Sequence, residues 1–525
     1  LFALEDKIQH SIDDGDLGFV KVKDLNTYVT PGSFIAPATT TPSIQRGIDA
    51  ASNGWTVNVN DGIYVENVNV NKQVTVDGYS QSGVIVYPAL SGPNPCSGAS
   101  LCPGASNIFL VQANNVTIKD LTADGNNTSL TSGVLSNGVD VDARNGIITD
   151  HTTGSFTNLN VQNVTVQNIY LRGIYFSTTG GSYNFSNNSV SNVAGESNSI
   201  GIMGWASTGT ISGNTVTNSN DGISLNHSIG TTIANNTVTG CGSGIHTDNN
   251  GSGGTGTADI ISNNTVSNCG YGIFAFAPYF NVSVDGNTVT NCDVGLTSAG
   301  TYSTAAPTFT NNVVDGTGKV NSYGVYSTTE IWGWVSGNQY ASFSNNYIQN
   351  TSNAFLLCSQ SGFTNNTSAN NNSITGNTLG VKLAADNTEI PPTGNFGLSM
   401  TCNWWGSNTV AGVVTAVGST DPAVTYDPWL VDGTDNDLVA IGFQPAPNSC
   451  TGAANLYVND LVSDNGTNDT YTTAIGDDAN AGTAAAPFLT ITKAVNTAVD
   501  GTKIWVDAGT FQEQVFIGKT VDITG

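Results

Sequence analysis

One short phrase recurs ten times between about residues 105 and 380: an Asn, a β-branched run, and then a second Asn or a Gly. The spacings from the second copy onward are 25, 26, 22, 28, 23, 25, 34 and 26 residues. Periods of about 20 to 50 residues indicate a solenoid, a propeller or an array. The repeated Asn residues are Asn115, Asn163, Asn188, Asn214, Asn236, Asn264, Asn287, Asn312, Asn346 and Asn372.

Each copy alternates apolar and polar residues and then turns at Asn or Gly, which indicates short strands rather than helices. A propeller blade needs about 40 residues, whereas the observed period suits one coil of a parallel β-helix. Equivalent strands of successive coils pair about 4.8 Å apart, so equivalent residues stack in ladders. We therefore expect the repeated Asn residues to form an internal or turn ladder joined by their side-chain amides.

Composition agrees with stacked strands and excludes several partners. Lys and Arg number 13 against 39 Asp and Glu, which gives a net charge of −26, and only 10% of residues are charged. Because the chain lacks clustered basic residues, we expect no nucleic-acid partner and no anionic membrane surface. It has no apolar run long enough to span a membrane. No signal peptide follows Leu1, so we expect a mature or excised piece of a longer protein.

Eight Cys residues are compatible with an oxidising, extracellular or cell-surface location. Cys96 and Cys102 close a short loop, for which we favour a local disulfide over free thiols. Three others each follow a repeated Asn by five residues and share one stacked position: Cys241, Cys269 and Cys292. A stack of buried thiols is favoured over a disulfide between neighbouring coils, and zinc is not expected because no fourth ligand falls in register. The pairing of Cys358, Cys402 and Cys450 stays open.

Both ends of the repeat carry candidate caps, which a solenoid needs to cover its open strand edges. Ser43 is suited to be the N-cap of a helix with Ile44 and Ile48 on one face, and Gly54 is a stop signal. At the far end, three Trp residues are expected to cover the last coil: Trp404, Trp405 and Trp429.

Residues 44–78 align without a gap to residues 491–525, with Glu66 matching Glu513 and Lys72 matching Lys519. This duplication predicts a linker or the tail of a preceding module at 1–43, a β-helix at 44–430, a linker at 431–451 and the start of a second β-helix module at 452–525. One coil cannot bury its own apolar face. The last segment is therefore expected to continue further, to rest on the first module or to dock on a neighbour.

The N-x-V-x-N phrase followed by Gly-Ile resembles the right-handed parallel β-helix family, often called pectin-lyase-like, over residues 44–430. The closing strings "CNWWGS" and "DPWL" and the lead-in "GDDANAGTAAAPF" resemble secreted modules of that family. The resemblance implies an all-β solenoid with a short N-terminal capping helix. It implies little about activity, because the fold hosts lyases, hydrolases, phage spikes and adhesins.

Asp140 and Asp142, close to Arg144, are the nearest approach to a metal or lyase site. Strand alternation would place all three on one face, where two carboxylates could hold calcium. Solvated outward charge is the favoured interpretation, so we expect no cofactor, with calcium as the open alternative.

The strand after each Gly-Ile phrase predicts two outward columns of side chains, with the Ile pointing inward. The first column is Tyr175, Met203, Ser224, His246, Phe274, Thr297 and Tyr326. The adjacent column is Ser177, Trp205, Asn226, Asp248, Phe276, Ala299 and Thr328. Exposed aromatic side chains in stacks suggest a contact surface.

Three interpretations of this face compete. It contacts a protein or lies under a loop, for which residues 328–343 are a candidate; it binds a polysaccharide; or His246 with Asp248 and Asp221 performs acid–base chemistry. We favour contact or cover. The chain is therefore interpreted as a non-enzymatic extracellular structural or adhesive module of a long tandem-repeat surface or filament-forming protein. Its partners would be copies of itself or neighbouring modules. A polysaccharide lyase or glycoside hydrolase, and a glycan-binding module, are the alternatives.

Overall fold

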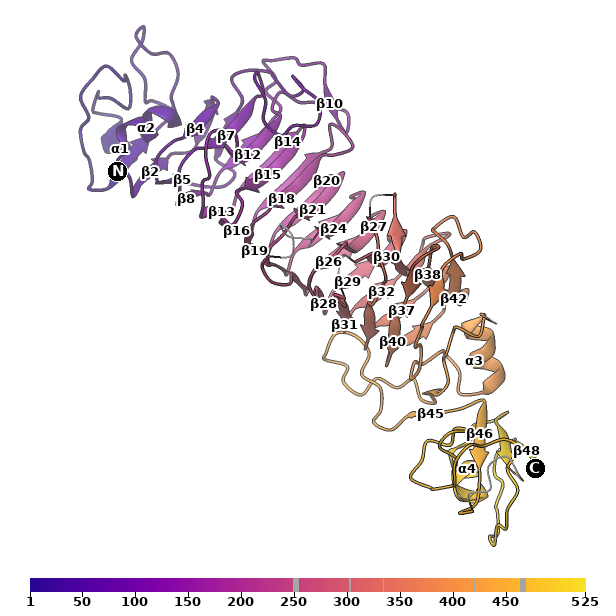
Figure 1. Cartoon of the computed structure of the whole chain (residues 1–525). Helices are drawn as coiled ribbons and strands as arrows, with labels where there is room; N and C mark the ends of the chain where they lie inside the picture. The colour runs from indigo at the N-terminus through magenta and orange to yellow at the C-terminus, as the bar shows by residue number, and fades with distance from the viewer. Residues whose placement is uncertain (249–254, 302–303, 334, 420, 463–468) are drawn as a thin grey trace. The chain divides into compact units, whose positions relative to one another are not determined.

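The computed structural model describes the chain except for residues 249–254, 302–303, 334, 420 and 463–468. Two compact units, Leu1–Pro307 and Thr308–Gly525, are each described by themselves. In both units the chain winds through three parallel sheets, here named A, B and C, and the described residues include four short helices (Figure 1). The structure therefore has the parallel β-helix architecture that the repeat predicts.

Successive coils of the first unit contribute one strand to each sheet. Sheet A contains β1 (Asn26–Val29), β2 (Trp55–Val59), β5 (Val74–Gly78), β8 (Val116–Lys119), β13 (Leu159–Gln162), β16 (Ser182–Ser186), β19 (Thr208–Ser212), β22 (Thr231–Ala234), β25 (Ile260–Ser262) and β28 (Ser283–Asp285). Sheet B contains β3 (Gly62–Val65), β6 (Val84–Tyr87), β9 (Thr122–Asp124), β14 (Thr165–Ile169), β17 (Ser189–Val193), β20 (Thr215–Ser219), β23 (Thr237–Thr239), β26 (Thr265–Ser267) and β29 (Thr288–Thr290). Sheet C contains β4 (Val68–Val70), β7 (Asn107–Val111), β12 (Asn145–Thr149), β15 (Arg172–Ser177), β18 (Ile200–Trp205), β21 (Asp221–Asn226), β24 (Ser243–Asp248), β27 (Tyr271–Phe276) and β30 (Val294–Ala299).

The other elements of the first unit lie outside these sheets. They are α1 (Phe2–Glu5), α2 (Ile44–Ala50) and the antiparallel pair β10 (Leu135–Ser136) and β11 (Val139–Asp140).

The second unit repeats the three-sheet coil and adds smaller elements. Its coil strands are β31 (Thr308–Thr310), β36 (Ser342–Ser344) and β40 (Ser368–Asn370) in sheet A, β32 (Val313–Asp315), β37 (Tyr347–Gln349) and β41 (Ser373–Thr375) in sheet B, and β33 (Tyr323–Thr328), β38 (Asn353–Cys358) and β42 (Leu379–Ala384) in sheet C. The additions are β34 (Glu330–Ile331), β35 (Val335–Ser336), β39 (Thr364–Asn365), β43 (Asn395–Phe396), α3 (Val410–Val417), β44 (Trp429–Leu430), β45 (Cys450–Gly452), β46 (Asn455–Val458), α4 (Ile491–Thr497), β47 (Lys503–Val506) and β48 (Asp522–Thr524).

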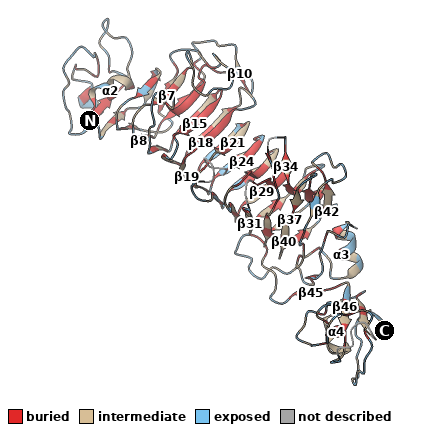
Figure 2. Cartoon of the chain, viewed as in Figure 1, coloured by how far each residue is buried: buried red, intermediate tan, exposed pale blue. Residues whose placement is uncertain are grey.

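The interior of the coils is apolar and stacked in register. One ladder on the inner face of sheet C consists of Ile174, Ile202, Ile223, Ile245, Ile273 and Leu296, all fully buried. Figure 2 shows the same pattern as buried colour along the strands of this sheet. Burying an aliphatic side chain of this size stabilises the fold by about 1.5–3 kcal/mol. Each added coil therefore contributes a similar stabilisation at this position of the ladder.

The predicted Asn ladder is present inside the turns. The backbone N–H and the side-chain amide of Asn214 both donate to Oδ1 of Asn236, at 2.9 Å each, and Asn236 does the same to Asn264. In the second unit Asn346 binds Asn372 in the same way. Because these Asn residues are buried, the ladder satisfies turn groups that would otherwise lack partners.

Asn163 was assigned to this ladder from the sequence, and that assignment is wrong by one position: its φ is 52°, and it lies in the left-handed turn just before the ladder. Asn115 was also assigned to the ladder, but it lies in a different left-handed turn, before β8 of sheet A, where its φ is 56° and its Oδ1 accepts the side-chain amide of Asn158. Val164 occupies the ladder position beside Asn163, and its backbone N–H donates to Oδ1 of Asn188. Asn tolerates the left-handed conformation, which explains why the turn and the ladder both select it.

The first coil is capped as predicted. Ser43 accepts the backbone N–H of Arg46 at the start of α2, and Ile44 and Ile48 are fully buried. Residues before this cap also join the fold, because β1 pairs in parallel with β2. The Arg46 guanidinium donates to three backbone carbonyls of residues 12–41 and thereby ties this N-terminal segment to the cap.

At the far end of the coils, in the second unit, Trp404 forms a bridge to Ser373 of β41, while Trp405 and Trp429 are buried. The amide of Asn403 continues the Asn ladder by accepting from Asn372. Residues 402–405 therefore extend the last coil, which agrees with the predicted closing role of this motif.

The duplicated segments make the same contacts. The Glu66 carboxylate accepts the first two backbone N–H groups of α2, and the Glu513 carboxylate accepts those of α4, at 2.5–3.2 Å. The ammonium groups of Lys72 and Lys519 donate to carbonyls at the C-terminal ends of the same helices. Each helix is thus held at both ends by one acid and one base, here named the Glu–Lys clamp.

The two copies differ in whether a further strand pairs with their last strand. Val76 of β5 is fully buried because β8 pairs with that strand. Its counterpart Ile523 is 38% exposed, and Phe516 is 78% exposed. Within the described part of the chain, no further strand pairs with the outer edge of β48.

Candidate functional site

The candidate site lies on the outer face of sheet C in the first unit. Strand register places the two predicted columns side by side across β15, β18, β21, β24, β27 and β30. The first row is Tyr175, Met203, Ser224, His246, Phe274 and Thr297. The second row is Ser177, Trp205, Asn226, Asp248, Phe276 and Ala299.

Most of these side chains were expected to be exposed, and the structure buries them. Tyr175 is 5% exposed and Phe274 is 1% exposed, while Phe276 and Asp248 are also buried. Tyr326, which lies on β33 of the second unit, is buried as well. The sequence pattern gives the direction of a side chain along a strand, but loops from distant parts of the chain decide whether it is covered.

A small outer cluster shows how the cover is made. Ile148, Tyr175 and Met203 pack together outside the coil, and Leu101 of the Cys96–Cys102 loop packs against them. The disulfide predicted for this loop is present. The candidate cover at residues 328–343 instead forms the antiparallel pair β34–β35 of the second unit, and its residue 334 lies outside the described residues.

Trp205 is exposed, whereas most other side chains of the two rows are buried. Its side chain is 37% exposed, and its ring lies 4.6 Å from the ring of His227. Asn226 follows it in the same row, then Asp248, so an aromatic surface stands beside an amide and a carboxylate. We name Trp205, His227 and Asn226 the Trp205 platform.

Burial changes the protonation of the two central titratable groups. The His246 ring stacks on Phe274 at 4.9 Å, and burial lowers its pKa to about 4, so the ring is neutral at pH 7. Its Nε2 has no hydrogen-bond partner among the described residues. Burial raises the pKa of Asp221 to about 6, against the attraction of Arg172, whose own pKa is lowered to about 10 by burial.

The three catalytic candidates do not converge. Asp221 pairs with Ser243 at the start of β24, and His246 lies three positions further along that strand, a displacement of about 10 Å. Asp248 is two positions beyond His246, so the two carboxylates are displaced by about 16 Å along the strands. Paired carboxylates of glycoside hydrolases stand about 5–9.5 Å apart, so Asp221 and Asp248 do not form such a pair.

The calcium candidates also separate. The Asp140 carboxylate accepts backbone N–H groups from Ser132 and Gly133, whereas Asp142 accepts that of Asn127. Asp142 is fully buried, so the expectation of a solvated outward charge is wrong for this residue. The reason is that the chain leaves the coil through β10–β11 and returns at Asp142. Among the residues that the structure describes, no group of three or more His, Cys, Asp or Glu side chains is placed to hold a metal ion.

Arg144, expected on the same outward face, is fully buried instead. Its guanidinium donates to the carbonyl oxygen of Ala99 in the Cys96–Cys102 loop and to that of Pro93, which precedes the loop. This contact makes Arg144 a structural support for that loop.

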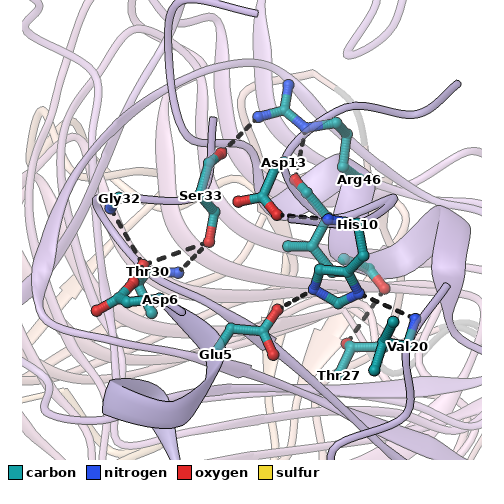
Figure 3. Close-up of polar contacts among 12 residues, drawn as sticks. Glu5, Asp6, His10, Asp13, Val20, Thr27, Thr30, Gly32, Ser33 and Arg46 are labelled. Carbon is teal, nitrogen blue, oxygen red and sulfur yellow. Dashed lines mark hydrogen bonds and ion pairs between the residues drawn. The ribbon is translucent and has the colours of Figure 1, made fainter. Parts of the chain in front are cut away.

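A buried polar cluster in the N-terminal segment was not predicted (Figure 3). His10 bonds to the Glu5 carboxylate through Nε2 and accepts the backbone N–H of Val20 through Nδ1. His10 and Glu5 are almost completely buried. Because Nδ1 accepts a hydrogen bond, the ring carries its proton on Nε2. The sequence signal for this pair is weak, since the two residues lie in a segment expected to be a linker.

Two further cysteine arrangements complete the chemistry of the chain. Cys402 and Cys450, whose pairing the sequence left open, form a disulfide, while the Cys358 thiol is buried. Cys241, Cys269 and Cys292 occupy one stacked position and are buried thiols, in agreement with the favoured interpretation.

Comparison with known proteins identifies the fold. Residues 145–314 match the family model described as a right handed beta helix region, and residues 474–519 match a protein of unknown function (DUF1565). No protein of curated function matches the chain in sequence.

Solved structures with a similar chain trace include enzymes and phage proteins. The family 28 exopolygalacturonase of Yersinia enterocolitica is 13% identical with a TM-score of 0.46, over 71% of this chain and 78% of that chain. The Dettilon tailspike protein is 17% identical with a TM-score of 0.39, over 71% and 68%. A polygalacturonase from Erwinia carotovora is 14% identical with a TM-score of 0.35, over 71% and 96%.

Similarity at this level concerns the fold alone. None of the helices in the described residues is long and apolar enough to cross a membrane. The family match over residues 145–314 and the three stacked parallel sheets agree, and together they identify the fold of the chain as a parallel β-helix, which the family model describes as right-handed.

Proposed function

We propose that this protein is a non-enzymatic extracellular β-helix module that holds a neutral polysaccharide on the outer face of sheet C. The observation that carries the proposal is the Trp205 platform, whose Trp ring is exposed whereas Phe276, the other aromatic side chain of the same row, is buried. Binding sites combine apolar surface with a few oriented polar groups. Trp205 supplies the first, and Asn226, which stands beside it in register, supplies the second.

The charge of the chain selects among polysaccharides. A net charge of −26 repels a polyanion at long range. A neutral polysaccharide avoids this repulsion, while its hydroxyl groups can bond to the amide of Asn226 and its apolar ring faces can lie on Trp205. The proposed ligand class is therefore neutral.

Affinity electrophoresis through gels containing a neutral galactomannan, a neutral xyloglucan or polygalacturonate tests this proposal. The chain should be retarded by at least one neutral gel and not by polygalacturonate, and Trp205→Ala should reduce that retardation about tenfold or more in apparent affinity. Trp332→Ala is the matched control, because Trp332 is also an exposed Trp but lies in the second unit. Equal retardation of Trp205→Ala and the unaltered chain, or no retardation in either neutral gel, contradicts the proposal.

A glycoside hydrolase or lyase is the second candidate, and the raised pKa of Asp221 favours it. A carboxyl that keeps its proton up to about pH 6 can act as a general acid. This function requires release of reducing or unsaturated sugar ends from a polysaccharide and loss of that release in Asp221→Asn. Such a result would replace the binding proposal with an enzymatic one.

A further inference from the structure

Three buried thiols lie in consecutive coils of the first unit at one stacked position. Thr239 of β23, Ser267 of β26 and Thr290 of β29 are in register, and a Cys follows each of them by two residues. The three are Cys241, Cys269 and Cys292. The backbone N–H of Cys269 donates to Sγ of Cys292 at 3.4 Å, and each of the three thiols donates to the backbone carbonyl two residues before it.

The spacing of the coils fits a bond between neighbours and excludes one between the ends. Adjacent strands lie about 4.8 Å apart, which is within the Cα separation of about 4.4–6.8 Å that a disulfide spans. Cys241 and Cys292 are two strands apart, about 9.6 Å, which is too far. Only Cys269 can therefore reach both of the others.

A surface hollow lies beside the backbone of Cys241. It has a volume of about 300 Å³, and its lining includes Gly240 and Gly242, the residues on either side of Cys241, together with Ser219 and Asn220. Cys241 and Cys292 are each 4% exposed and Cys269 is 1% exposed, so a reagent meets one of the two outer thiols before it meets Cys269.

We propose that Cys269 is the shared member of a disulfide across the coils, formed with Cys241 or with Cys292 when the protein meets a small-molecule disulfide. The thiolate of an outer member of the stack, Cys241 or Cys292, attacks one sulfur of the reagent RSSR, which forms a mixed disulfide and releases one RS⁻. The Cys269 thiolate then attacks Sγ of that outer Cys and releases the second RS⁻. Two thiols lose two protons and two electrons, and RSSR is reduced to two RSH.

The bond can pass along the stack. A Cys292 thiolate that attacks Sγ of Cys269 forms Cys269–Cys292 and returns Cys241 to a thiolate, with no net change in oxidation state. The two neighbouring thiols lower the pKa of Cys269, whereas the pKa of Cys241 is raised, which supports Cys269 as the thiolate that attacks the mixed disulfide. The Cys96–Cys102 and Cys402–Cys450 disulfides show that the chain is suited to an oxidising location.

Thiol counting with a chromogenic disulfide in denaturant, before and after treatment with oxidised glutathione, tests the proposal. The unaltered chain should fall from four thiols to two, because Cys358 and one member of the stack remain. Cys241→Ser and Cys292→Ser should each fall from three to one, since Cys269 still has one neighbour. Cys269→Ser should keep all three. Cys358→Ser, remote in sequence from the stack, is the matched control and should fall from three to one.

Circular dichroism of each variant confirms that the coils are intact, and Cys269→Ala replaces Cys269→Ser if the serine variant loses its β signal. Four thiols remaining in the treated unaltered chain would overturn the proposal. So would equal thiol loss in the chain without Cys269, or loss of oxidation when only Cys241 or only Cys292 is removed.

Discussion

At sheet C, the burial of a side chain affects its protonation more than its residue type does. Asp221 and His246 both favour their neutral forms, because packing withdraws water from the carboxyl and from the ring. The sequence predicted the row in which His246 stands, whereas Asp221 lies outside both rows. It could not predict their burial, because a covering residue such as Leu101 comes from a loop about 75 residues away from Tyr175.

Asp221 gives the stability of the chain a specific pH dependence. Its pKa is about 6 in the folded chain and 3.8 when exposed, so the folded state binds the proton more tightly. Stability contributed by this group therefore falls as the pH rises from about 4 to about 6 and stays lower above that range. Asp221→Asn should be more stable than the unaltered chain at pH 7 by about 1–3 kcal/mol and nearly equal to it below pH 4.

Urea unfolding at both pH values measures this difference. Asp16→Asn, at an exposed position in the N-terminal segment, is the control for the loss of one negative charge. A destabilised Asp221→Asn at pH 7 would show that the ionised carboxylate has a favourable partner and would contradict the account.

At the level of elements, the caps and ladders follow from the sequence more closely than the surface does. The N-cap at Ser43 and the Asn ladder from Asn188 onward were predicted, because both depend on residues close in sequence or on a fixed period. Asn163 was misplaced by one position, since a turn Asn and a ladder Asn are adjacent in the sequence, and Asn115 was placed in the wrong turn, since the turn before a sheet A strand also selects Asn. In the sequence the Glu–Lys clamp appeared only as matching Glu and Lys positions in the aligned segments, because its contacts depend on the fold.

The equal clamps predict that the two caps are interchangeable. A chimera in which residues 491–525 replace residues 44–78 should fold with an unchanged β signal in circular dichroism, since Glu513 and Lys519 hold α4 as Glu66 and Lys72 hold α2. The same chimera carrying Glu513→Ala should lose about 1–3 kcal/mol, because two helix N–H groups lose their acceptor. Urea unfolding compares the two. A chimera that fails to fold, or one indifferent to Glu513→Ala, contradicts the equivalence.

At the level of the whole molecule, the repeat period was sufficient to predict the fold. It did not predict the structure of the ends or the loops that cover the outer face of sheet C. One repeat of about 25 residues dictates coils, sheets and ladders throughout both units. The N-terminal segment was predicted to be a linker or the tail of a preceding module; in the structure β1 joins sheet A, and Glu5 and His10 are buried. The Cys402–Cys450 bond likewise joins residues 48 positions apart, which no local pattern shows.

Because loops cover the other aromatic side chains of sheet C, the Trp205 platform is the proposed contact point on this face. Locating the bound polysaccharide tests this claim most directly. Hydrogen–deuterium exchange of the chain with and without the neutral polysaccharide that retards it measures this by peptide. The account predicts added protection in the turns after β18 and β21, at residues 205–208 and 226–230, next to Trp205 and His227. Protection confined to sheet A or sheet B, or none at these turns, would contradict it.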